Sequence, residues 1–156
     1  MNRLKIIKGD ATKPNVEPCV IAHICNNRGI WSKGFVNSLT QTFGYLPKEQ
    51  YRIWFQKFAL TRKIPLGSVQ FVNISENIKI ANMVCQEGLI SFEGVKPIRY
   101  EAVEEALKFV MKNHNEIHMP KIGCGLAGGK WSMIQEILVR LLEEYKNCNI
   151  TVYESE

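Results

Sequence analysis

A glycine-rich segment near the C-terminal end most constrains how this chain can fold. Four glycines, Gly123, Gly125, Gly128 and Gly129, fall within seven residues, so the backbone there carries few side chains and can adopt positive φ angles. Residues 131–145 follow with apolar side chains at helical spacing. A glycine loop leading into a helix N-terminus can bind an anion, most often phosphate. The alternative is a tight turn between a strand and a helix.

Length and composition limit the class of protein. A chain of 156 residues is long enough for one domain with a substantial core, and we expect residues 1–156 to form it. Five cysteines without a CxxC pair favour reduced thiols and a cytoplasmic location. No apolar run approaches the roughly 20 residues that span a membrane, so no membrane partner is expected. The sequence predicts neither a metal site nor a cofactor.

The charge of the chain favours an anionic partner. The formal net charge is +5, but the basic residues are spread along the chain with acidic residues between them. No basic cluster with interleaved aromatic residues, RNA-recognition signature or zinc-finger spacing is present. A small molecule that carries phosphate is therefore favoured over nucleic acid.

Strand-like and helix-like segments alternate along the chain. Strands are predicted at 4–10, 19–25, 68–73, 77–83, 116–119 and 149–153, with the third and fourth antiparallel. Helices are predicted at 35–43, 47–60, from Pro97 onward, and after the glycine loop. This alternation predicts an α/β sandwich without a linker or repeat. Ligands bind such sheets beyond the carboxyl ends of the strands, where two glycine-bearing loops fall.

Several polar residues next to the strand ends are candidates for function. Asp10 is either a turn residue or a carboxylate that accepts a hydrogen bond from an exocyclic amine. His23 is either a core histidine or an acid or base facing the loop. Asn26 and Asn27 either turn the chain or bind ribose hydroxyls, and Cys25 is expected to be a small buried apolar residue.

Four segments, taken in chain order, resemble the macro domain (macrodomain) family. They are Gly9-Asp10-Ala11-Thr12, then Ala22-His23-Ile24-Cys25-Asn26-Asn27 with Gly34, then Met119-Pro120-Lys121-Ile122-Gly123-Cys124-Gly125-Leu126, and finally Thr151-Val152-Tyr153. The last two segments are similar to the branch that contains the terminal ADP-ribose protein glycohydrolase and the ADP-ribose 1″-phosphate phosphatase. The first loop, with His23, Asn26, Gly29 and Trp31, is similar to that of the phosphatase.

The resemblance implies a three-layer α/β/α fold with a mixed sheet of about six strands and one ADP-ribose cleft. Asp10 would meet the adenine amine, Tyr153 would lie near the adenine ring or its ribose, and Gly34 with the Asn26–Asn27 segment would border the distal ribose. The glycine loop would wrap the diphosphate with backbone amides. The implied ligand-binding residues are Asp10, Ala11, Asn26, Asn27, Trp31, Gly34, Gly123, Cys124, Gly125, Leu126, Ala127, Gly128 and Tyr153.

Three departures from the family pattern bear on catalysis. Ala127 stands where the glycohydrolase branch has an aspartate, the segment 84–86 lacks its catalytic lysine, and Val36 replaces an aspartate of another hydrolase branch. His23 remains the candidate for acid or base work. The expected function is the hydrolysis of a small ADP-ribose derivative, with ADP-ribose 1″-phosphate as the leading substrate. The alternative is a non-catalytic module that binds ADP-ribose or an ADP-ribosylated protein.

Overall fold

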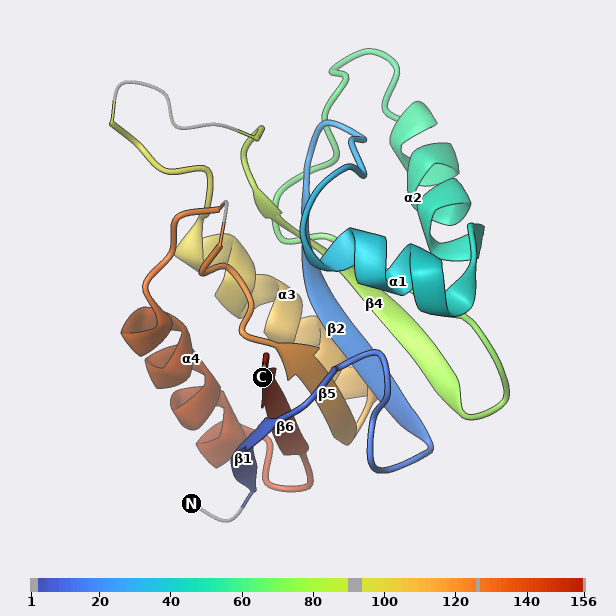
Figure 1. Cartoon of the computed structure of the whole chain (residues 1–156). Coiled ribbons are helices and arrows are strands. Elements are labelled where there is room, and N and C mark those ends of the chain that lie inside the picture. Colours follow the sequence, from blue (N-terminus) through green and yellow to red (C-terminus); the bar gives the residue numbers. More distant parts are fainter. Residues whose placement is uncertain (1–2, 90–93, 126, 156) are drawn as a thin grey trace.

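A computed structural model describes residues 3–89, 94–125 and 127–155 (Figure 1). The strands are β1 (Leu4–Lys8), β2 (Cys19–Asn26), β3 (Val69–Asn73), β4 (Ile78–Gln86), β5 (Glu116–Pro120) and β6 (Asn149–Glu154). The helices are α1 (Phe35–Phe43), α2 (Leu46–Gln56), α3 (Tyr100–Asn113) and α4 (Trp131–Glu144). Within these ranges, no helix combines the length and the hydropathy that crossing a membrane requires.

The strands form one mixed six-stranded sheet in the order β1-β6-β5-β2-β4-β3. All neighbours pair in parallel except β3, which is antiparallel to β4 as predicted. Almost every residue of β2 is buried, which explains its continuous apolar sequence, because a central strand is covered on both faces. The carboxyl ends of the five parallel strands therefore meet at one edge of the sheet.

Helices cover both faces of the sheet and complete the predicted three layers. Figure 1 shows α1 and α2 on one side and α3 and α4 on the other. One buried cluster joins α3 and α4 to the sheet through side chains such as Val103, Leu107 and Leu138. A second cluster lies beneath α1 and α2, and includes Leu39 and Tyr51. The sheet thus lies between the two buried clusters and packs against both.

The largest boundary differences from the sequence prediction are at two helices and one strand. The helix expected over 47–60 ends at Gln56, because the chain then tightens into turns in which the N–H of Phe58 donates to the carbonyl of Phe55. β4 extends three residues beyond Met83. The helix expected from Pro97 begins only at Tyr100, because the backbone before it is extended and bonds to the end of β4 and to the glycine loop.

Candidate functional site

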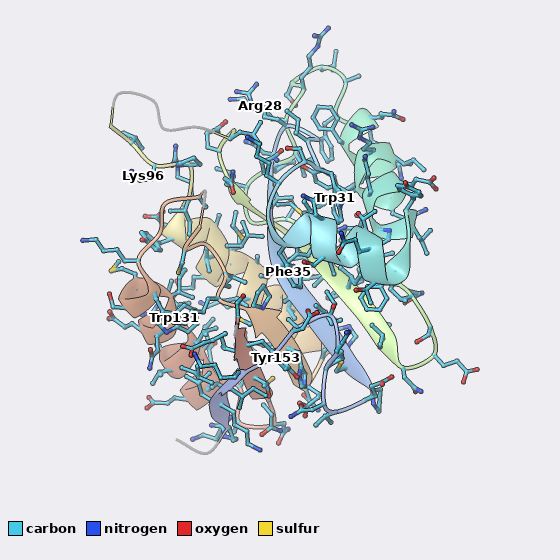
Figure 2. The ribbon with its side chains drawn as sticks, in the orientation of Figure 1. Arg28, Trp31, Phe35, Lys96, Trp131 and Tyr153 are labelled. Atoms are coloured by element: carbon cyan, nitrogen blue, oxygen red, sulfur yellow. The ribbon has the colours of Figure 1, made fainter. Side chains whose placement is uncertain are left out.

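A cleft made of two adjoining pockets lies at the edge where the parallel strands end. The pocket that we call the glycine-loop pocket has a volume of about 220 Å³ and is lined by His23, Ile24, Lys33, Gly34, Phe35, Val36, Gln86, Pro120, Lys121, Ile122, Gly123, Gly125 and Ala127. The β1 pocket has a volume of about 380 Å³ and is lined by Gly9, Asp10, Ala11, Phe35, Ser38, Pro120, Tyr153 and Ser155. Because Phe35 and Pro120 line both pockets, the two pockets adjoin, and we call them together the cleft. Figure 2 shows Phe35 and Tyr153 in the middle of the molecule, between α1 and α4.

The glycine loop folds back on itself to form one wall of the cleft. Gly123 has a φ of 75°, and its carbonyl accepts a hydrogen bond of 2.6 Å from the N–H of Gly129. Gly125 accepts another from the N–H of Gly128 at 3.0 Å, and Ala127 accepts one from the N–H of Ile98 at 3.1 Å. These bonds hold the loop against the segment before α3.

Two other predicted members of this loop, Cys124 and Gly128, are not among the residues that line the two pockets. The thiol of Cys124 donates to the carbonyl of Ile122 at 3.3 Å, and Gly128 packs against the side chain of Lys96. Leu126 lies outside the described residues. The predicted loop therefore contributes to the cleft through Gly123, Gly125 and Ala127.

The helix N-terminus at the cleft belongs to α1 rather than to α4. The four residues Lys33, Gly34, Phe35 and Val36 line the glycine-loop pocket, and no side chain caps the helix that begins at Phe35. α4 begins at Trp131 as predicted, but that residue does not line the pocket. A first helical turn carries amide N–H groups without intrahelical partners and partial positive charge. The helix dipole suited to an anion at this pocket is thus that of α1.

Asp10 and Tyr153 lie together in the β1 pocket. Asp10 is exposed, and its Oδ1 accepts hydrogen bonds from the backbone N–H of Thr12 at 2.9 Å and from the Thr12 hydroxyl at 2.8 Å. Ala11 is buried beside it. Asp10 therefore stabilises its own turn and also lines the β1 pocket, while acceptance of a hydrogen bond from an amine stays a prediction.

The Tyr153 ring is held by a buried histidine that the sequence did not point to. Its hydroxyl lies 2.7 Å from Nδ1 of His118, whose Nε2 lies 2.7 Å from the carboxylate of Glu116. The Tyr153 hydroxyl also accepts a hydrogen bond from the N–H of Asn15 at 3.0 Å. Burial raises the pKa of Tyr153. The only signal in the sequence was the alternation of Glu116 and His118 on one face of a strand.

Asn26 and Asn27 shape the loop after β2 rather than line the pockets. The Asn26 amide donates to the carbonyl of Ile30 at 2.7 Å, and its Oδ1 accepts from the N–H of Arg28 at 2.8 Å. Asn27 accepts a hydrogen bond from the N–H of Gly88 at 3.0 Å. Neither side chain is among those that line the two pockets. The geometry favours their chain-turning role.

Trp31 lies beneath the cleft rather than in its wall. It is 5% exposed, and its indole N–H donates to the hydroxyl of Thr40 at 3.0 Å. Its ring packs edge-on against the His23 imidazole, with 5.4 Å between the ring centres, and also against Tyr51. Trp31 therefore supports the floor on which His23 lies.

His23 is the ionisable group most deeply placed at the cleft. It is 1% exposed, and its Nε2 lies 2.5 Å from Oδ1 of Asn82. Burial lowers the pKa of His23 to about 4, although the hydrogen bond to Asn82 acts in the opposite direction. His23 is therefore neutral near pH 7 and can accept a proton but not supply one. Cys25, which is also buried, has its sulfur 3.8 Å from the same Nε2.

The three departures from the family pattern all lie at the glycine-loop pocket. Val36, Gln86 and Ala127 line it. The ionisable side chains among its lining residues are His23, Lys33 and Lys121, so the described wall carries positive charge and no carboxylate. Lys121 also forms an ion pair of 2.8 Å with Glu154. The pocket suits an anionic group or a polar neutral group.

Comparison with solved structures finds close similarity over nearly the whole chain. A protein of unknown function from Bacteroides thetaiotaomicron is 41% identical, with a TM-score of 0.87 and 97% of each chain covered. A macrodomain protein from Streptomyces coelicolor is 35% identical, with a TM-score of 0.80, covering 96% of this chain and 97% of that one.

More distant structures share the fold. A mutant macrodomain from Oceanobacillus iheyensis, solved with ADPR, is 16% identical, with a TM-score of 0.71, covering 97% of this chain and 84% of that one. No protein-family model matches the chain, and a search of curated proteins finds no match.

Proposed function

Because the chain belongs to the macrodomain family, we propose that it binds ADP-ribose in the cleft formed by the two pockets. The observation that carries this proposal is that the two pockets adjoin and share Phe35 and Pro120 in their linings. A ligand with a nucleoside at one end, a diphosphate in the middle and a second ribose at the other end could occupy two adjoining pockets. The macrodomain solved with ADPR supports this choice of ligand.

Each part of the ligand would meet a group of suitable chemistry. The adenosine end would lie in the β1 pocket, where the second carboxylate oxygen of Asp10 accepts from the adenine amine and Tyr153 packs on the base or its ribose. The diphosphate would lie against the glycine loop and the first turn of α1, where amide N–H groups suit anionic oxygens. The distal ribose would lie near His23, in the carboxyl-terminal half of β2.

Replacing Asp10 with asparagine tests the adenosine end. The introduced amide keeps an oxygen for Thr12 but replaces one carboxylate oxygen with an N–H group, which cannot accept from an amine. We expect ADP-ribose binding, measured by calorimetry, to weaken by about 1–3 kcal/mol. Glu76→Gln, an exposed change in the turn between β3 and β4, is the matched control. Unchanged affinity in Asp10→Asn would remove the adenine assignment, and no heat for the unmodified protein at submillimolar ligand would refute ADP-ribose binding.

A second candidate function is hydrolysis of an ADP-ribose derivative, with ADP-ribose 1″-phosphate as the leading substrate. It is favoured by the position of His23, whose Nδ1 is buried without a partner among the described residues. In this reaction a water oxygen attacks phosphorus, its proton passes to Nδ1, the bond from phosphorus to the ribose oxygen breaks, and that oxygen takes the proton back from Nδ1. Lys33 and Lys121 would offset the phosphate charge. The lack of a carboxylate among the lining residues instead favours the non-catalytic module, which binds ADP-ribose or an ADP-ribosylated protein.

Phosphate release separates these two candidates. If His23 is the base, His23→Ala should lower the rate of phosphate release from ADP-ribose 1″-phosphate by about 100-fold or more, while ADP-ribose still binds. The same assay on an ADP-ribosylated glutamate peptide and on O-acetyl-ADP-ribose defines the substrate class. Equal rates in the two proteins would reject His23 as a participant. No turnover by the unmodified protein would favour the non-catalytic binding module.

A further inference from the structure

Three polar side chains form a row across the sheet beneath α1 and α2. His23 of β2 pairs in register with Asn82 of β4, and Asn82 pairs with Gln70 of β3. Apolar pairs on the same face flank this row, including Ile21 with Ile80. Polar groups in such a layer are costly unless they are hydrogen-bonded. The row is therefore an ordered network within a core.

The direction of each hydrogen bond in the row is determined from one end. The side-chain amide of Gln70 lies 2.9 Å from the backbone carbonyl of Gln50 in α2, and a carbonyl can only accept. Gln70 must direct its NH₂ to that carbonyl, so its oxygen accepts from the NH₂ of Asn82 at 3.0 Å. The oxygen of Asn82 then faces Nε2 of His23 at 2.5 Å. Any reversal would place two acceptors opposite each other at Gln50.

This order decides which ring nitrogen of His23 carries the proton. An imidazole nitrogen that faces an amide oxygen must donate, so Nε2 carries the hydrogen. In the neutral ring Nδ1 then has only a lone pair. Nδ1 is the one buried side-chain nitrogen or oxygen among the described residues that has no hydrogen-bond partner. The rings of Trp31 and Phe35 flank the imidazole, at 5.4 and 5.9 Å between ring centres, and His23 lines the glycine-loop pocket.

We propose that Asn82 and Gln70 are positioning residues that fix His23 as a hydrogen-bond acceptor for a hydroxyl of the distal ribose. This inference rests on the proposed binding of ADP-ribose in the cleft. The ionised diphosphate carries only acceptors, so it cannot satisfy Nδ1, whereas a ribose hydroxyl can. The row thereby makes the distal end of the cleft selective for a sugar. It also couples that selectivity to α2, because Gln70 bonds to the backbone of that helix.

Nitrogen NMR of the ligand-free protein tests the first half of the proposal. Long-range proton–nitrogen correlations of the imidazole distinguish the two neutral tautomers. We expect His23 to show the Nε2–H form near pH 7, and we expect Asn82→Leu to change that pattern because it removes the acceptor. A spectrum of the unmodified protein with hydrogen on Nδ1 would overturn the proposal.

Calorimetry with two nucleotides tests the second half. ADP-ribose carries the distal ribose and ADP does not, so damage to the row should affect only the first. In Asn82→Leu, affinity for ADP-ribose should fall by about three- to tenfold, the range expected for one hydrogen bond, and affinity for ADP should change by less than about twofold.

A second variant at the other end of the row gives an independent test. Gln70→Leu lies at a half-buried position and should give the same selective loss to a smaller extent, so the test survives if Asn82→Leu does not fold. Equal losses for ADP and ADP-ribose in both variants would overturn the proposed role of the row but not the proposed binding of ADP-ribose. If the unmodified protein binds neither nucleotide, the proposed function is refuted and the inference falls with it.

Discussion

Gly123→Ala should unfold the glycine loop, which forms one wall of the cleft, and should abolish measurable ADP-ribose binding at submillimolar ligand. Gly123 has a φ of 75°, and a residue with a Cβ in this region costs about 1–2 kcal/mol. The added Cβ would also overlap Cδ1 of Ile98 and lie 3.3 Å from Cδ1 of Ile24. Overpacking of a core typically costs about 1–3 kcal/mol, so the free energy of unfolding, measured in urea, should fall by about 2–5 kcal/mol.

Gly125→Ala is the matched control for stability. It lies two residues further along the same loop, its φ is not in the positive range, and a Cβ there meets nothing within 4 Å. Its free energy of unfolding should stay within about 0.5 kcal/mol of the original, as for ordinary surface changes. Equal stability of the two variants would show that the loop does not depend on the backbone conformation of Gly123.

Acid should destabilise the protein through His23. The pKa is lowered to about 4 in the folded chain from an ordinary value of 6.5. Between these values the unfolded chain binds a proton that the folded chain does not, so the stabilising contribution is complete above pH 6.5 and is lost as the pH falls toward 4. Each pKa unit corresponds to about 1.4 kcal/mol, which gives a total loss of about 3 kcal/mol.

His23→Gln isolates this contribution. Glutamine can donate to Asn82 and accept with its oxygen, but it does not titrate. The difference in free energy of unfolding between the two proteins, measured in urea at pH 7.5 and 4.5, should change by about 2–3 kcal/mol in favour of the variant at low pH. Other titrating groups cancel in this difference. A difference that is the same at both pH values would contradict a neutral buried imidazole.

The fold was largely predictable because its elements are short and their patterns differ. The continuous apolar sequence of β2 and the spacing of apolar side chains in α3 each match only one type of secondary structure. The boundaries were less predictable because long-range contacts decide them. The extended backbone before Tyr100, for example, exists because the N–H of Ile98 finds its partner at Ala127, and nothing local in the sequence indicates that bond.

The parts of the site that depend on local sequence were predictable. The parts that depend on strand register were missed. The glycine loop, Asp10 and His23 stand out in the sequence and do line the two pockets. Gln70 and Asn82 gave no signal, because their meeting with His23 depends on which residues are opposite each other across three strands. The ligand roles of the predicted residues stay predictions until the binding experiments are done.

Because Phe35 and Pro120 line both pockets, the proposed ligand would occupy the two pockets at once, as a chelating ligand does. Each pocket can hold one end of a ligand, and a molecule that joins both ends pays the entropy of association once. After one end is bound, the other is presented at a high effective concentration. The affinity of the whole would then exceed that of either part by more than the contacts of the linker explain. Changes that move the two pockets apart would lose this gain even if every polar contact remained.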